Sequence, residues 1–496
     1  MNRWLFVFVA LVFIASNLVF AVSLQWVPAL IVSFAVATSA VLVCQRDSQT
    51  KALFLDAPIN LRLLAVCLAL ATALLLLGGE THLFYANLDW LIRDAVLGDL
   101  TARTAPIHYL YHGVEYFLRA PLGMYLLPAT AGKVFGLSAA HLVLLAQNAL
   151  LCSIILYVVG SLSGGWRLVI LMIAFSGADI VPTLLDHFLR PDSGGIPDDL
   201  ELWNGQIQYS SHVTQLFWVP NHALPGWFFA TLCLLALRGE IDLAILGVFF
   251  ASALIWSPLA VLSGLVYLPF FAWNARARLF SSKRLWFGAL AGAAFFPVAY
   301  YLTIDAGSVP HGLTSLGAPL YLAFIAIEIP HAFFLIWLWR RVPPTVRGLL
   351  IASIAILLLL PFFSFGPYND LVMRGSIAPL FVLSFVFADV ALRLSPDDKW
   401  PKKAVFWIVA LGAFTPGLEF RRALTHPSFA ISSCDLLTAA HQLDASGAPA
   451  NYIARVDAAP ASLMRAAPDP AFSIIAKPCW PDHPLRAQLP PLPPAE

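Results

Sequence analysis

Charged residues are scarce in this chain of 496 residues. Only 11% are Asp, Glu, Lys or Arg, against about a quarter in soluble globular domains, whereas 60% are hydrophobic. The formal net charge is +1 and no basic run is present, which argues against a nucleic-acid partner. The apolar stretches are continuous rather than alternating, a pattern that disfavours a transmembrane β-barrel.

The apolar stretches recur with lengths of about 17 to 25 residues, enough for a helix to cross roughly 30 Å of hydrocarbon. We therefore expect an all-α polytopic membrane protein with about 13 transmembrane helices. One of two segments, 121–137 or 168–182, is expected to be too short to span. The predicted parts are an N-terminal hairpin with a cytoplasmic loop (1–61), a transmembrane core (62–420) with external loops at 80–120, 183–216 and 366–375, and a C-terminal tail (421–496).

The positions of Lys and Arg predict the orientation, because basic loops tend to remain cytoplasmic. The basic loops are 45–62, 275–284, 340–347 and 395–403. They predict a multi-pass protein of the cytoplasmic membrane with a cytoplasmic N-terminus and an external tail. For the first apolar stretch, a cleaved signal peptide ending near Ala21-Val22-Ser23 is the alternative.

Two of the six cysteines, Cys434 and Cys479, fall in the external tail. A disulfide between them would stabilise a segment too small to build much core, and two free thiols are the alternative. The other four lie in or beside apolar spans and are expected to be small buried side chains: Cys44, Cys67, Cys152 and Cys233.

Nearly all the polar chemistry lies in three islands, NLDWLIRD (87–94), HVTQLFWVPNH (212–222) and YNDLVMR (368–374). The predicted topology places all three on the external side. Acids, guanidinium groups and imidazoles are costly near lipid, so these islands indicate a site at the membrane interface.

In the first island Asp89 and Arg93 are spaced i,i+4, as are Trp90 and Asp94, so each pair shares a helix face. One interpretation is a surface ion pair worth a few tenths of a kcal/mol. The other is a carboxylate that faces a reacting group and is oriented by Arg93.

The segment after the first island adds His108 and Arg119. His108 and His112 have the spacing of a helical metal pair, but two ligands without an HExxH motif make a weak site. Packing within the loop or hydrogen bonds to phosphate are the alternatives.

The second island brings five polar or aromatic side chains to a helix entrance: His212, Gln215, Trp218, Asn221 and His222. An aromatic belt with satisfied amides is the alternative to a binding role. The third island contributes Asn369, Asp370 and Arg374, for which a local i,i+4 ion pair is the alternative. Arginine suits phosphate because its planar fork donates two parallel charge-assisted hydrogen bonds.

An early acid in a large first external loop (Asp89), a Pro-containing helix entrance (RAPLGMYLLP), the Phe135-Gly136 pair and many further helices resemble the GT-C superfamily of membrane glycosyltransferases. The resemblance implies transfer of a sugar from a polyprenyl-phosphate-linked donor at the outer face of the membrane, with Asp89 as the catalytic base. It leaves a divalent cation open as cofactor and sets no oligomeric state. The adjacent acids common in that family and the WWDYG-type signature are absent.

Arg374 and Arg119 are the expected phosphate ligands, and His212, Gln215, Asn221 and His222 are expected to shape the sugar pocket. The remaining predicted substrate-binding residues are Trp90, Arg93, Asp94, His108, Trp218, Asn369 and Asp370. The alternative function is a transporter or flippase, because Glu328 and His331 form an i,i+3 pair inside the apolar span 318–339.

Overall fold

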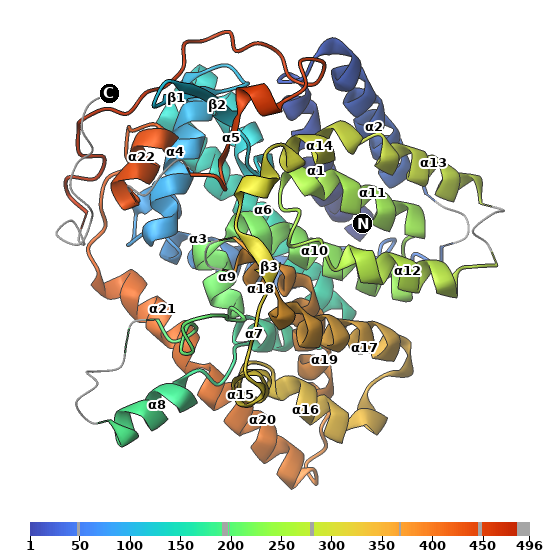
Figure 1. Cartoon of the computed structure of the whole chain (residues 1–496). Coiled ribbons are helices and arrows are strands. Elements are labelled where there is room, and N and C mark those ends of the chain that lie inside the picture. The colour runs from blue at the N-terminus through green and yellow to red at the C-terminus, as the bar shows by residue number, and fades with distance from the viewer. Residues whose placement is uncertain are drawn as a thin grey trace.

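The structure, a computed structural model, describes residues 1–46, 50–190, 197, 199–277, 282–366, 369–444 and 449–483. The chain is mostly helical (Figure 1). The helices are α1 (Asn2–Ala21), α2 (Trp26–Cys44), α3 (Leu61–Leu77), α4 (Leu88–Ala102), α5 (Gly123–Phe135), α6 (Leu137–Leu162), α7 (Trp166–Ile173), α8 (Ile180–Leu189), α9 (His212–Trp218), α10 (Pro220–Leu237), α11 (Leu243–Ser252), α12 (Gly264–Asn274), α13 (Lys283–Ala293), α14 (Phe296–Thr303), α15 (Ala318–Glu328), α16 (Pro330–Trp337), α17 (Pro344–Leu359), α18 (Asp370–Gly375), α19 (Ile377–Leu392), α20 (Lys399–Gly412), α21 (Phe414–Thr425) and α22 (Leu436–Leu443).

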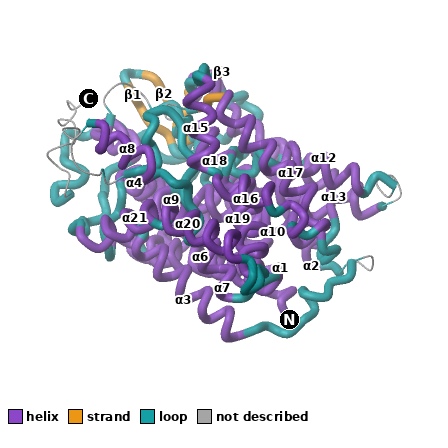
Figure 2. The backbone as a smooth tube through the Cα atoms, turned by 90° about the horizontal axis from the view of Figure 1, so that it is seen from below, coloured by secondary structure: helices purple, strands orange, loops and turns teal. Residues whose placement is uncertain are grey.

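Five short strands form two small antiparallel sheets. The strands are β1 (His108–Tyr111), β2 (Val114–Leu118), β3 (His311–Leu313), β4 (Phe363–Phe365) and β5 (Ile453–Arg455). One sheet has the order β1-β2-β5 and the other pairs β3 with β4. Figure 2 shows β1, β2 and β3 along one edge of the molecule and the N-terminus at the opposite edge.

Seven helices in the described residues are long and apolar enough to cross a membrane: Asn2–Ala21, Trp26–Cys44, Leu137–Leu162, Lys283–Thr303, Pro344–Phe362, Asp370–Leu392 and Lys399–Thr425. The bent pair α15 and α16 makes an eighth if it is counted as one span. These helices agree with an all-α membrane protein, whereas the predicted count of about 13 spans is not confirmed.

Both segments suspected of being too short fall short of a full span. α5 covers 13 residues and contains Pro128, and it ends at Gly136, whose φ is 88°. The segment 168–182 is divided between α7 and α8 by a non-helical stretch, in which the Ala178 N–H donates to the Ile327 carbonyl. The sequence identified the weak spans but not that both of them fail.

The break between α15 and α16 follows from Pro330. The two helices meet at 73°, and Pro330 is the first residue of α16. Proline has no N–H to donate to the preceding turn, so α15 ends before it. The backbone of Ile329, with φ −126° and ψ 51°, is non-helical at this point.

The hairpin of β1 and β2 forms because His112 and Gly113 both have positive φ. Tyr111 pairs with Val114, which leaves these two residues as the turn. A two-residue turn with positive φ at both positions matches the twist of the strands. The helical spacing considered for His108 and His112 is therefore wrong, because one lies in a strand and the other in a turn.

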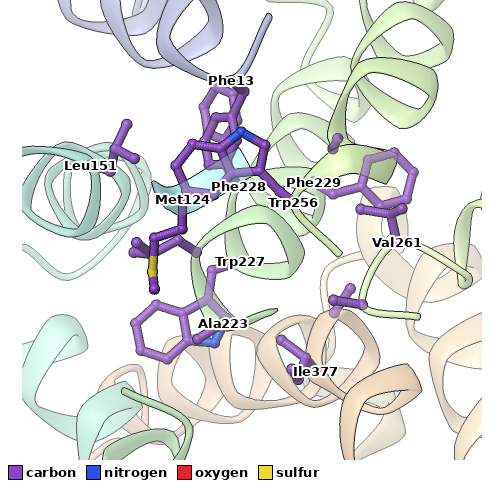
Figure 3. Close-up of a cluster of buried hydrophobic side chains, with 14 of the residues drawn as sticks. Phe13, Met124, Leu151, Ala223, Trp227, Phe228, Phe229, Trp256, Val261 and Ile377 are labelled. Atoms are coloured by element: carbon purple, nitrogen blue, oxygen red, sulfur yellow. The ribbon is translucent and has the colours of Figure 1, made fainter. Parts of the chain in front are cut away.

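The interior is an aromatic core that joins helices distant in sequence (Figure 3). The ring centroids of Phe13 and Trp256 lie 4.5 Å apart, and those of Phe13 and Phe228 lie 5.6 Å apart. Gly123 lies directly against Trp256, and a Cβ at this position would overlap the indole ring. A glycine here lets the start of α5 approach the core closely.

The tail lies beside β1, β2 and α4, which belong to the segment that follows α3 (Figure 1). Its Leu436 N–H donates to Asp99 Oδ2 on α4 at 2.9 Å, and its Phe472 N–H donates to the His108 carbonyl at 2.9 Å. Of the two alternatives for Cys434 and Cys479, the structure has the disulfide rather than two free thiols. Of the other cysteines, Cys44 is exposed, contrary to expectation, and the remaining three are buried.

Candidate functional site

The first island is anchored to the second through the Phe217 carbonyl. Asn87 caps α4, accepting a hydrogen bond from the Asp89 N–H at 3.0 Å and donating its amide to Phe217 O at 2.8 Å. The Trp90 indole N–H also donates to Phe217 O, at 3.1 Å, and to Gly78 O at 2.7 Å. Trp90 is 1% exposed, so this predicted binding residue positions the start of α4 instead.

Asp89 and Arg93 form the expected ion pair, with Arg93 Nη2 and Asp89 Oδ2 at 3.0 Å. The Asp89 side chain is 39% exposed and that of Arg93 is 6% exposed. Burial lowers the pKa of Arg93, but the Asp89 carboxylate more than offsets this and the pKa is raised, so the guanidinium remains charged. Its Nε and Nη1 atoms have no hydrogen-bond partner among the residues that the structure describes.

The third island forms a similar pair at the start of α18. Arg374 Nη1 lies 2.5 Å from Asp370 Oδ1, and both side chains are largely buried. Asn369 precedes the helix with a positive φ of 54°, a conformation that asparagine tolerates. Gly366, at φ 85°, lies so close that a Cβ would overlap the Asp370 carboxylate. Tyr368, the first residue of this island, lies outside the described residues.

The two ion pairs belong to one group of charges. The carboxylates of Asp89 and Asp370 are close enough to act on each other electrostatically. All four charges act on the hydroxyl of Tyr452. We refer to Asp89, Arg93, Asp370 and Arg374 as the charge cluster. Two islands that are separated by about 280 residues of sequence therefore meet in space.

The second island reaches the charge cluster through His222. The charges of Arg93 and Arg374 both act on its ring. His222 Nδ1 is 2.6 Å from Ser257 Oγ, and Nε2 is 3.1 Å from the Asn221 amide nitrogen. With the amide donating to Nε2, the ring proton resides on Nδ1 and the imidazole is neutral. All three islands thus contribute to the same site.

Two tyrosines that the sequence argument missed also face the charge cluster. Tyr125 on α5 interacts electrostatically with Arg93 and Asp89, and Tyr452 in the tail interacts with all four charges. Burial raises the pKa of both phenols, so both keep their protons at neutral pH. Tyr125 lies within the RAPLGMYLLP segment noted in the sequence, whereas no sequence signal marked Tyr452.

Further free donors and acceptors surround the charge cluster. Arg374 Nε, Asn369 Oδ1 and Asn221 Oδ1 are buried and have no partner in the part of the chain that the structure describes. Buried polar groups are rarely left unpaired, and each such group calls for an explanation. Together with the free nitrogens of Arg93, they make the charge cluster a place where a polar ligand can be held.

Two predicted binding residues of the second island, His212 and Gln215, make their contacts inside the helix bundle. His212 donates from Nδ1 to the Met172 carbonyl at 2.6 Å and packs on Phe175. Gln215 donates to the Ser210 carbonyl at 2.8 Å and accepts from the Trp227 indole at 2.8 Å. Both side chains are fully buried, and no described contact joins either to the charge cluster.

Asp94 and Trp218 also make internal contacts. Asp94 Oδ2 is 2.5 Å from His82 Nε2, and His82 Nδ1 donates to the Phe429 carbonyl at 2.9 Å. The Trp218 indole donates to Glu419 Oε1 at 3.0 Å, with the Arg422 guanidinium 5.0 Å from the ring. Asp94 is therefore connected to the tail through His82, and Trp218 connects α9 to α21.

Arg119 and His108 contact the tail. Arg119 donates through Nη2 to the Ala450 carbonyl at 2.5 Å, and its charge acts on Asp305 rather than on the charge cluster. His108 belongs to β1, where burial lowers the pKa of its imidazole. Arg119 is therefore connected to the site through the tail. The backbone carbonyl of His108 accepts a hydrogen bond from the N–H of tail residue Phe472.

The residues at the charge cluster do not fit a bound divalent cation. No group of three or more His, Cys, Asp or Glu side chains that could hold a metal occurs in the described residues. Asp89 and Asp370 each face an arginine, which competes with a cation for the carboxylate.

Comparisons with protein-family models, characterised proteins and solved structures find no match to this chain. The geometry and chemistry of the charge cluster are therefore the basis on which a function can be inferred.

Proposed function

We propose that this protein is a membrane glycosyltransferase of the GT-C kind, which moves a sugar from a polyprenyl-phosphate-linked donor to an acceptor at the outer face of the cytoplasmic membrane. The observation that carries the proposal is the charge cluster, where an accessible carboxylate adjoins buried arginine N–H groups without partners. Inverting sugar transfer needs a base near the acceptor hydroxyl and positive charge near the departing phosphate. The charge cluster offers both.

Asp89 is the proposed base because its side chain is 39% exposed, whereas that of Asp370 is 11% exposed. It would remove the proton from the acceptor hydroxyl as the new C–O bond forms at the sugar. The bond to the phosphate oxygen breaks at the same centre, and the lipid phosphate leaves with that electron pair. Arg93 and Arg374 would stabilise the phosphate charge through their free N–H groups.

The position of the charge cluster suits a lipid-linked donor. Asp370 begins an apolar helix that runs to Leu392 and is long enough to cross a membrane. A phosphate at the headgroup level could therefore meet Arg374 while the polyprenyl chain remained in hydrocarbon. The disulfide between Cys434 and Cys479 supports an external tail, because disulfides persist in oxidising compartments.

The proposal is tested by transfer from a purified polyprenyl-phosphate sugar to an acceptor in proteoliposomes. Asp89→Asn should lower transfer by about 10²- to 10⁴-fold, the usual contribution of a general base, in protein that remains folded. Asp186→Asn is the matched control, because Asp186 also pairs with an arginine at i+4 but is 54% exposed on α8. Full transfer by a folded Asp89→Asn protein would overturn the proposal.

A second candidate function, a transporter, is favoured by the break between α15 and α16. Glu328 ends α15 there, fully buried with Asp179 and Glu201 nearby. The Trp203 indole donates to Glu328 at 2.9 Å, and the Thr415 hydroxyl donates to Asp179 at 2.9 Å. Broken helices with ionisable groups occur at transporter binding sites. Flux of a labelled lipid-linked sugar across proteoliposomes without covalent transfer would favour this candidate.

A further inference from the structure

The tail is built into the site through its backbone. β5 pairs with β2, and Leu118 lies opposite Ile453. The Arg119 N–H donates to the Tyr452 carbonyl at 2.7 Å, and the Arg119 guanidinium donates to the Ala450 carbonyl at 2.5 Å. These contacts from Leu118 and Arg119 therefore hold the backbone on both sides of Tyr452.

The side chain of Tyr452 faces the charge cluster from the tail. It is half-buried, and its hydroxyl senses the charges of Asp89, Arg93, Asp370 and Arg374. A neutral phenol beside two guanidinium groups can donate to an anionic oxygen that the arginines also bind.

The disulfide closes the chain segment that carries Tyr452. Cys434 and Cys479 are 45 residues apart, and Tyr452 lies between them. Cys434 leads into α22, which is held to α4 by the hydrogen bond between Leu436 and Asp99. The Cys479 N–H donates to Gln442 on α22 at 3.0 Å, so both ends of the segment meet at this helix. Such a cross-link restricts the freedom of the intervening chain.

We propose that Tyr452 is a substrate-binding residue whose hydroxyl donates a hydrogen bond to the phosphate of the lipid-linked donor, and that the disulfide-bonded tail is therefore part of the donor site. This inference rests on the proposed function, because it takes the phosphate as the group held between Arg93 and Arg374. The site is then complete only when the tail is docked on β2.

The first test is the affinity of the purified protein in nanodiscs for a polyprenyl phosphate, measured by the change in tryptophan fluorescence. Tyr452→Phe keeps the ring and removes the hydroxyl, so affinity should fall by about tenfold or more, as for loss of a hydrogen bond to a charged group. Tyr116→Phe is the matched control, because Tyr116 lies on β2 opposite Arg455 and acts on that residue. Its affinity should be unchanged.

The second test breaks the disulfide between Cys434 and Cys479. Reduction of the wild-type protein, or the double change Cys434→Ser and Cys479→Ser, should lower the affinity as Tyr452→Phe does. Reduction of the Tyr452→Phe protein should add little, because both changes remove the same contact. Amide hydrogen exchange at Tyr452 and Arg119 reports whether the tail has left β2, independently of any activity.

The outcomes distinguish a failure of the role of Tyr452 from a failure of the proposed function. Binding by the wild-type protein together with equal affinity for Tyr452→Phe would overturn the role of Tyr452 and leave the proposed function standing. No binding of polyprenyl phosphate by the oxidised wild-type protein would overturn the lipid-phosphate donor and, with it, the role of Tyr452.

Discussion

Asp89 and Arg93 face each other across 3.0 Å, yet only the carboxylate is substantially open to solvent. An ordinary surface ion pair exposes both partners and contributes little to stability. Here the guanidinium is buried and retains two nitrogens without partners in the described residues. The pair therefore combines an accessible acid with unused donors, an arrangement that favours ligand binding over a purely structural role.

The planar guanidinium of Arg93 should contribute more to sugar transfer than its positive charge alone. Arg93→Lys keeps the positive charge but loses the parallel N–H groups that suit a phosphate. We expect kcat/KM for sugar transfer to fall by roughly 10- to 100-fold, the cost of a lost hydrogen bond to a charged group. The measurement is steady-state transfer with varied donor concentration. Arg190→Lys, at a 78% exposed position paired with Asp186, is the control and should behave as wild type.

Gly366 should be needed to shape the third island. Gly366→Ala places a Cβ where φ is 85° and against the Asp370 carboxylate. We expect a lower melting temperature, from a backbone cost of about 1–2 kcal/mol, and reduced transfer because Asp370 and Arg374 shift. Gly205→Ala separates these effects, since Gly205 also has positive φ but has open space around it. Equal transfer by the two variants would contradict the steric role of Gly366.

Glu80 should make stability depend on pH. Burial raises the pKa of Glu80 from 4.5 to about 8, with the Asn148 amide and the Arg93 charge opposing the shift. The folded state therefore retains a proton that the unfolded state releases. The contribution is fully present below about pH 4.5 and is lost as the pH rises through about 8. A shift of this size corresponds to roughly 5 kcal/mol at most.

The check is thermal unfolding of wild type and Glu80→Gln between about pH 5 and 9. The glutamine has no proton to lose, so the melting temperature of the variant relative to wild type should rise across this range and level off above pH 8. Glu115→Gln, at an exposed position on β2, is the control. A difference between Glu80→Gln and wild type that does not vary with pH would show that the folded protein holds Glu80 ionised.

The sequence was informative where a polar group stands out from apolar surroundings. Asp89, Arg93, Asp370 and Arg374 could be predicted because charges beside apolar spans are costly and therefore informative. Pro330 accounts for the break between α15 and α16, because proline removes a backbone donor.

The sequence was uninformative where polar side chains make hydrogen bonds inside the helix bundle. His212 and Gln215 share the polar character of His222, but their hydrogen bonds to Met172, Ser210 and Trp227 lie in the interior. Only the packed structure separates a side chain that stabilises the fold from one that faces a ligand.

Tyr452 was missed for a different reason. The pairing of β5 with β2 joins strands that are more than 330 residues apart, and both strands are too short to leave a clear alternating pattern. The count of about 13 spans is not confirmed, because apolar length alone does not reveal breaks such as that between α7 and α8.

The most direct test of the central claim is a structure of the protein with a non-hydrolysable polyprenyl-phosphate sugar analogue. We predict phosphate oxygens at about 3 Å from nitrogens of Arg93 and Arg374, with the anomeric carbon facing Asp89. The phosphate bound elsewhere, for example beside the buried acids Asp179 and Glu328, would contradict the account.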